Sequence, residues 1–153
     1  MTIVAVTRLH VRSIRFLLRL YWDGRKIKRS LKKAPGFLGG KLLVDRNRAY
    51  WTITCWKDLD SMLAFRNSRV HAAVARMVYK WCDEASVVHW ATKEDQLPSW
   101  KEAHRRMTES GKLTRLMFQT ADHKAHRFRQ PYWTNSREES LEPKFSLRLL
   151  KAR

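Results

Sequence analysis

The sequence is poor in cysteine, proline and glycine, and it has no long hydrophobic run. Its 153 residues include 2 cysteines, 4 prolines and 5 glycines. Cys55 and Cys82 form no Cys-x-x-Cys pair, which excludes a disulfide framework and a cysteine zinc site; both are expected to be buried in a reducing, cytoplasmic protein. The most apolar stretch, 14–22, is interrupted by Arg15 and Arg19, so no membrane span is expected. No basic segment precedes the short apolar start, and no signal peptide is expected.

Acidic residues are scarce as well. The chain has 14 Asp and Glu against 32 Lys and Arg, a formal net charge of +18. Within residues 12–33, Asp23 is the single acid among the bases Arg12, Arg15, Arg19, Arg25, Lys26, Lys28, Arg29, Lys32 and Lys33. Such a surface attracts polyanions. Two interpretations stay open: a solvated basic surface, or a 12–33 face that binds nucleic acid or another polyanion non-specifically. No helix-turn-helix, zinc finger or RNP-type motif favours a sequence-specific nucleic-acid binder.

Motifs of the common enzyme classes are missing too. The sequence has no Gly-x-Ser-x-Gly, no phosphate-binding glycine loop and no His-Glu-x-x-His. The glycines at 36–40 follow a predicted helix and precede a predicted strand, the reverse of the order in a nucleotide-binding loop, so they indicate a turn. His123 and His126 have a metal-ligand spacing without a third ligand nearby, and no metal site is expected.

Hydrophobic periodicity predicts one domain in which strands and helices alternate. Strands are expected at 2–12, 37–44, 49–56 and 86–93, and helices at 14–33 and 58–81, the second interrupted at Asn67–Ser68. The first helix is expected to kink or break at its glycine, and its inward stripe is predicted to be Ile14, Leu17, Leu18, Tyr21, Gly24, Ile27 and Leu31. The order β-α-β-β-α-β is that of a ferredoxin-like α+β sandwich, with helices on one face of the sheet.

The predicted strand 49–56 is apolar on both faces. Trp51 and Ile53 point one way, and Tyr50 and Trp56 point the other. Leaving a Tyr and a Trp in water costs about 25 cal/mol per Å² of apolar surface. We therefore expect another copy of the sheet to cover the second face, in a homodimeric β-barrel with a pocket.

The chain after the sandwich divides further. We expect a ferredoxin-like domain over 1–95, a C-terminal helical extension packed on the barrel over 96–130, and a tail over 131–153. Within the extension, a helix is predicted at about 99–110, with Gly111 as its stop.

Three segments carry a resemblance to a known family. They are "GFLGG" at 36–40, "YWTITCW" at 50–56 and "SMLAFRNSRVH" at 61–71, and "LPSW" at 97–100 fits the uncharacterised neighbours of that family. The chain resembles the antibiotic-biosynthesis-monooxygenase-like proteins, which are dimeric α/β barrels, over about residues 2–130. The resemblance implies a ferredoxin-like homodimer. It also implies oxygen chemistry on an electron-rich aromatic substrate, either without a cofactor or on haem.

His71 is the candidate base or ligand that this resemblance points to. In the haem-degrading branch of the family, a helix His binds iron, an upstream Trp covers the porphyrin and a first-strand Asn assists. Of these only His71 matches, because Phe65 and Thr7 stand at the other two positions. Haem is therefore disfavoured, and no cofactor is expected. The alternative for His71 is a structural, half-buried histidine beside the helix interruption.

Further residues complete the predicted site. Tyr50, Trp56, Phe65, Thr7 and His89 are expected to line the pocket between sheet and helices. Arg66 and Arg69 are candidates for binding an anionic group of the ligand, or else belong to a solvated helix face. The leading functional interpretation is a small monooxygenase-like or ligand-binding protein for an apolar or aromatic molecule. Its alternatives are a non-catalytic dimeric binding protein and a polyanion binder that uses the 12–33 face.

Overall fold

A computed structural model describes residues 1–94, 96–132 and 137–144. Its strands are β1 (Thr2–Val11), β2 (Phe37–Val44), β3 (Ala49–Trp56), β4 (Cys82–Thr92), β5 (Lys112–Leu113) and β6 (Arg137–Leu141). Its helices are a 3-10 turn η1 (Ile14–Phe16), α1 (Leu17–Leu31), α2 (Leu59–Arg66), α3 (Arg69–Trp81), α4 (Trp100–Ser110) and α5 (Ala121–Lys124).

The strands form one sheet in the order β5-β4-β1-β3-β2-β6, and the strand pairs are antiparallel. The inner order β4-β1-β3-β2, with α1 after β1 and α2 and α3 after β3, is the ferredoxin-like arrangement, so the predicted α+β fold is confirmed. Residues 137–141, expected in a tail, instead form the edge strand β6, which is anchored by the buried Leu141. Residues 133–136 and 145–153 of that tail lie outside the described residues.

Local sequence signals explain where the elements begin. The side chains of Asp58, Ser68 and Ser99 accept hydrogen bonds from backbone N–H groups in the first turns of α2, α3 and α4. These caps satisfy donors that a helix start leaves unpaired. Gly36 precedes β2 with φ of 78°, and a Cβ there would lie 2.2 Å from Oγ of Ser61. Only glycine fits this turn.

Two predictions about the first helix are wrong. The helix runs through Gly24 without interruption, because one glycine costs only about 1 kcal/mol in a helix held by packing. Its inward side is also rotated: Ile14, Leu18 and Tyr21, expected in the core, are exposed. Leu17 and Leu31 of the predicted stripe do pack in the core, and Phe16 and Leu20 join them in place of the exposed residues.

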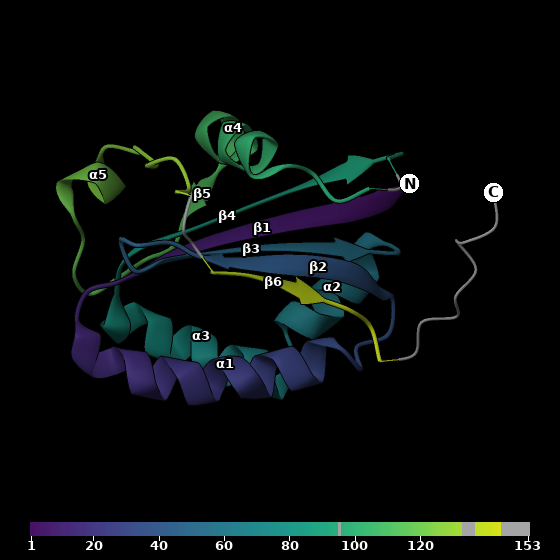
Figure 1. The fold of residues 1–153 in the computed structure, drawn as a ribbon, viewed down its shortest axis with the longest axis horizontal. Coiled ribbons are helices and arrows are strands. Elements are labelled where there is room, and N and C mark those ends of the chain that lie inside the picture. Colours follow the sequence, from purple (N-terminus) through teal and green to yellow (C-terminus); the bar gives the residue numbers. More distant parts are fainter. Residues whose placement is uncertain (95, 133–136, 145–153) are drawn as a thin grey trace.

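Helices cover both faces of the sheet (Figure 1). One face, here called the helix side, lies against α1, α2 and α3. The opposite face, the α4 side, carries Trp51 and Ile53 packed with Trp100, Ala103 and Met107. The expectation of helices on one face only is therefore wrong, because the C-terminal extension folds back over the Trp51 face. The face of Tyr50 and Trp56, which a partner sheet was predicted to cover, lies against helices of the same chain. Homodimerisation itself stays a prediction, now without the argument from an uncovered face.

Candidate functional site

The helix side of the two central strands has apolar ends and a middle of small residues. Across β1 and β3, Ile3 pairs with Trp56 at one end, and Leu9 pairs with Tyr50 at the other. Between them, Ala5 pairs with Thr54 and Thr7 with Thr52. We call Thr7, Thr52 and Thr54 the threonine floor. Although both strands have neighbours on either side, these three side chains are only partly buried.

Two separate hydrophobic clusters flank this floor. The cluster at one end contains Trp56, Phe37 and Leu31 with Met62 of α2. The cluster at the other end contains Val11, Val78 and Cys82, and Tyr50 packs against it. None of the three threonines belongs to either cluster. The core on the helix side is therefore divided in two, with the threonine floor between the halves.

Helix α1 repeats this division along its length. Leu17, in the first turn of α1, packs in the cluster that contains Tyr50, and Leu31 packs in the cluster that contains Trp56. Gly24 lies midway between them, seven residues from each, which is close to two helical turns and so on the same side of the helix. A Cβ at Gly24 would meet no heavy atom within 4 Å. We call the region between Gly24 and the threonine floor the inter-layer space.

The two edges of the inter-layer space differ. One cross-strand row runs from Glu139 of β6 through Leu42, Thr52 and Thr7 to Val87 of β4. At the β6 edge, Nζ of Lys28 on α1 lies 2.8 Å from a carboxylate oxygen of Glu139, which joins the helix to the sheet. At the β4 edge, Val87 is 41 % exposed. At the β6 edge, 41 % of the Glu139 side chain is exposed, so both edges are partly open to solvent.

An aromatic row closes the Trp56 end. The ring centroid of Trp56 lies 5.4 Å from that of Phe37 and 5.3 Å from that of Phe65. The ring centroid of Phe65 lies 5.5 Å from that of His71, with the two rings edge to face. Nε1 of Trp56 donates a 3.0 Å hydrogen bond to Oγ1 of Thr54, which satisfies the indole and fixes one end of the floor. Three of the predicted site residues, Trp56, Phe65 and His71, are therefore in contact through Phe65.

His71 is a neutral side chain at this end. Burial lowers the pKa of its imidazole, while a hydrogen bond with the Arg66 backbone partly counters that effect. Its Nδ1 is buried, and no described residue partners it. An unmet buried hydrogen bond of this kind costs about 1–3 kcal/mol. Haem fits poorly here, because Phe65 stands between His71 and Trp56 in the place that a porphyrin beside the imidazole would need.

The other predicted residues are more scattered. Tyr50 lies on the helix side but at the far end of the floor, where burial raises the pKa of its phenol. His89 points to the helix side, opposite to Val88 and Trp90, and it is exposed. Arg66 and Arg69 are exposed at the junction of α2 and α3, in agreement with a solvated helix face.

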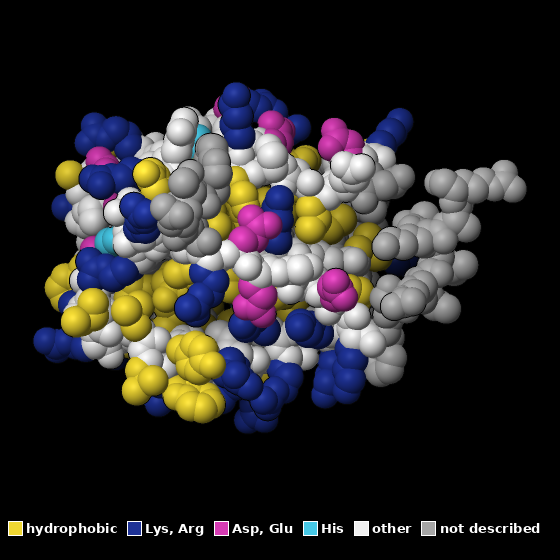
Figure 2. All heavy atoms as spheres, in the orientation of Figure 1, with side chains coloured by type: hydrophobic (Ala, Val, Ile, Leu, Met, Phe, Trp, Pro, Cys, Tyr) yellow, Lys and Arg dark blue, Asp and Glu magenta, His cyan; other side chains and the backbone are white. Residues whose placement is uncertain are grey.

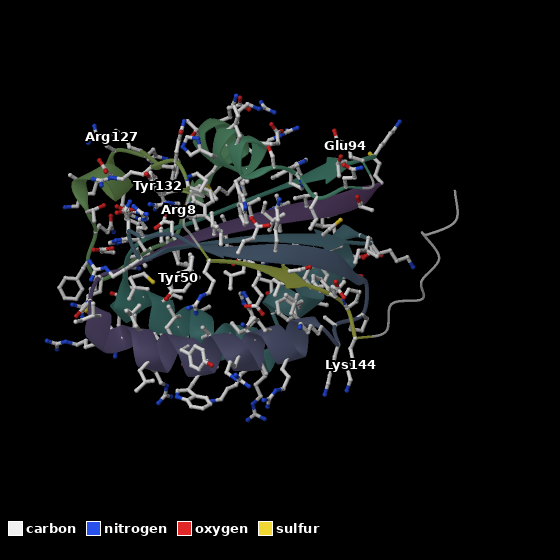
Figure 3. The ribbon with its side chains drawn as sticks, viewed as in Figure 1. Arg8, Tyr50, Glu94, Arg127, Tyr132 and Lys144 are labelled. Carbon is white, nitrogen blue, oxygen red and sulfur yellow. The ribbon has the colours of Figure 1, made fainter. Side chains whose placement is uncertain are left out.

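A polar cavity of about 270 Å³ lies on the other side of the sheet. Figure 3 shows Arg8 and Tyr50 on opposite sides. Arg8 is buried, forms an ion pair with Glu84 and stacks over Trp51, and Thr120 donates to the same carboxylate. Burial opposes ionisation of Glu84, but Arg8 outweighs it and holds the pKa of the carboxyl below its usual range. His10 is partly buried against Asp83.

The charged groups around this cavity form ion pairs and hydrogen bonds with neighbouring residues. Asp122 pairs with Arg127 and Arg129, and Asp45 accepts from the backbone N–H groups of Asn47 and Ala49. We interpret the cavity as the fastening of the C-terminal extension to the sheet. In the described ranges, no three His, Cys, Asp or Glu side chains gather as a metal site would require. No described helix is long and apolar enough to cross a membrane.

Comparisons with known proteins agree with this fold. The family model described as "Domain of unknown function (DUF3291)" matches residues 16–142. A comparison with curated proteins gives no match. Among solved structures, a variant of SnoaB from Streptomyces nogalater, described as a cofactor-independent oxygenase, is 16 % identical with a TM-score of 0.52; the alignment covers 61 % of this chain and 94 % of that one.

Two further structures have similar values. A conserved protein from Methanosarcina mazei is 14 % identical, with a TM-score of 0.55 and coverage of 61 % of this chain and 94 % of that chain. An antibiotic biosynthesis monooxygenase is 12 % identical, with a TM-score of 0.54 and coverage of 60 % and 99 %. Identities this low show a shared fold. The predicted resemblance to monooxygenase-like proteins is confirmed at that level.

Proposed function

This chain belongs to the DUF3291 family, and we propose that it binds a small, largely apolar aromatic molecule in the inter-layer space and oxidises it in the manner of a monooxygenase. The proposal rests on two gaps that face each other, one in the helix layer at Gly24 and one in the sheet at the threonine floor. Gly24 presents no side chain, and a Cβ there would meet nothing within 4 Å. Opposite it, the threonine floor stays partly exposed between two hydrophobic clusters.

The surroundings favour a neutral ligand with one or two hydroxyl groups. Aromatic and aliphatic side chains bound the space at its two ends, near Trp56 and near Tyr50. The floor offers hydroxyl groups, which both donate and accept hydrogen bonds. Lys28 and Glu139 at the edge neutralise each other. This combination of apolar walls and few polar groups is typical of small-molecule sites.

The proposed chemistry uses His71 as the base. A neutral imidazole whose Nδ1 lacks a partner takes the proton of a phenolic hydroxyl. The phenolate passes one electron to dioxygen, and the aryloxyl radical and superoxide combine into a C–O bond. His71 returns its proton to the peroxide, which loses water to leave a quinone. Dioxygen is the oxidant, so the sequence of steps balances without a bound cofactor.

A second candidate is binding without turnover, in a dimeric or monomeric carrier. It is favoured by the position of His71, whose Nδ1 is buried and whose ring packs on Phe65. Because Nδ1 is buried, a substrate hydroxyl reaches it only after neighbouring side chains move. The floor itself, made of threonines, supplies no group that is a base at neutral pH.

The test begins with the purified protein, whose absorbance and mass spectrum reveal an aromatic molecule that co-purifies. Fluorescence titration with naphthol, a neutral two-ring phenol, then measures binding by the wild type, His71→Ala and the control His89→Ala. If His71 meets the ligand, His71→Ala weakens binding and loses about 1 kcal/mol or less of stability. A structural histidine gives intact binding and a loss of about 1–3 kcal/mol. Dioxygen uptake with bound naphthol separates the two candidates: uptake supports oxygenation, and its absence supports a carrier.

A further inference from the structure

The outer side of α1 and of the turn before it carries an exposed apolar stripe. Ile14 is 72 % exposed, Leu18 71 %, Trp22 55 % and Tyr21 53 %. The first three are spaced four residues apart, so they lie in one row along the helix surface. In Figure 2, hydrophobic side chains gather at the lower left of the molecule, where Figure 1 places α1, beside dark-blue basic groups. Large apolar side chains are normally exposed singly, and a contiguous row marks an interaction surface.

Basic side chains surround this stripe. The exposed cations of the same helix and its flanks are Arg15, Arg19, Arg25, Lys26, Arg29 and Lys33. The single acid of the helix, Asp23, is buried at the edge of this surface and pairs with two of these cations, Arg19 and Lys26. The outer surface of α1 is thus apolar in its first half and cationic along its flank and its second half.

The apolar surface continues beyond the helix. The guanidinium of Arg12 lies between two rings, 4.8 Å from the centroid of Phe16 and 4.4 Å from that of Phe118. Phe118 and its neighbour Met117 are each 48 % exposed. The segment after β5 therefore extends the stripe at the N-terminal end of α1.

We propose that this outer face of α1 docks on an anionic lipid bilayer surface and lies parallel to it. Aliphatic side chains together with Trp and Tyr, bordered by Arg and Lys, form the pattern of helices that lie in the membrane interface. Indole and phenol rings favour that depth, and the flanking cations meet anionic headgroups. The inward side of α1, with Gly24, faces away from the bilayer, so this proposal is independent of the proposed function.

Charge complementarity decides against the other occupants. A second copy of this face would bring two sets of cations together, in a chain whose formal net charge is +18, without acids to pair them. Nucleic acid satisfies the cations, and Trp22 and Tyr21 would stack on bases. It leaves Ile14 and Leu18, the two most exposed members of the stripe, without an apolar partner.

Co-sedimentation with vesicles tests the proposal on the full chain. We expect binding to vesicles of phosphatidylcholine and phosphatidylserine in equal parts, weakened by salt, and much weaker binding to phosphatidylcholine alone. The double variant Leu18→Ser/Trp22→Ser is expected to bind at least about tenfold more weakly, because it loses two inserted side chains. Its control, Leu38→Ser/Val87→Ser, removes exposed apolar groups from β2 and β4 and keeps binding.

A charge series completes the design. Arg15→Gln/Arg29→Gln is expected to bind about 25-fold more weakly, at about fivefold for each cation near an anionic surface. Lys101→Gln/Arg105→Gln removes the same charge from α4, on the opposite face of the sheet, and changes binding little. Equal losses for both charge pairs would overturn the proposal, as would normal binding by Leu18→Ser/Trp22→Ser. Two other results would overturn the proposal. One is that the wild type fails to bind vesicles while Leu18→Ser/Trp22→Ser abolishes its retention on RNA. The other is that Leu18→Ser/Trp22→Ser converts a dimer into a monomer.

Discussion

The buried Arg8–Glu84 pair offers a sharp test of how the extension is held to the sheet. Arg8 is 3 % and Glu84 7 % exposed, and the carboxylate accepts from Arg8 and Thr120. Glu84→Gln keeps the shape of the side chain and removes its charge. Because Arg8 then stays buried without a counter-charge, we expect a loss of about 3–5 kcal/mol in the free energy of unfolding. For a domain of this size, that loss lowers Tm by about 6–20 °C.

Two companion variants separate the ion pair from its surroundings. Arg8→Met/Glu84→Gln removes both charges and keeps an unbranched side chain over Trp51, so it should recover much of the loss. Glu102→Gln is the matched control. Glu102 pairs with Arg105 and Arg106 at the surface of α4 with a third of its side chain exposed, and such pairs contribute about 0–1 kcal/mol. Urea unfolding followed by circular dichroism gives the values.

Acid titration checks the same pair independently. Arg8 holds the pKa of Glu84 below its ordinary value of 4.5. The unfolded state therefore takes up this proton first as the pH falls. The stability that the pair supplies should be complete above pH 4.5 and decline below it, and Glu84→Gln should remove that part of the acid limb. A loss below 1 kcal/mol for Glu84→Gln, equal to that of Glu102→Gln, would refute the reasoning.

Three further predictions follow from the helix side and from the assembly. Gly24→Ala should raise the free energy of unfolding by about 1 kcal/mol in thermal or urea melts, because alanine favours a helix and its Cβ has open space; a destabilised variant would show that the space is filled. Stability that depends on His71 should fall with pH below 6.5, since burial lowers the pKa of its imidazole, and His71→Ala should lack this dependence in melts at several pH values. Light scattering at micromolar concentration should show a homodimer, and a stable monomer would end that prediction.

The strands were the part of the fold that the sequence predicted best. The bounds of β2 and β3 match the prediction, because Pro35–Gly36 and Asp45–Arg48 bracket two runs of alternating side chains. The break at Asn67–Ser68 is also confirmed, since Ser68 caps α3. The orientation of α1 was missed because its helix has two apolar rows, and spacing alone does not say which row meets the sheet.

The candidate site was predicted only in part. The resemblance pointed to Phe65 and His71, and the alternation of strand 49–56 pointed to Trp56. The structure brings the three rings into contact, while their role in a site stays a prediction. The sequence predicted only that Gly24 weakens the helix. Its proposed role, leaving room for a ligand, depends on the distance from α1 to the sheet, and a sequence pattern does not contain that distance. The covering of Trp51 by α4 was missed for a similar reason: the amphipathic 100–110 segment could be recognised as a helix, but not assigned to a face.

Binding of naphthol by the Gly24 series tests the central claim, that the inter-layer space holds the ligand. Fluorescence titration is made with the wild type, Gly24→Ala and Gly24→Phe, each shown to be folded by circular dichroism. The account predicts similar dissociation constants for the wild type and Gly24→Ala, and at least about tenfold weaker binding by Gly24→Phe, whose ring fills the volume that the ligand needs. Unchanged binding by Gly24→Phe, or no binding by the wild type, would contradict it.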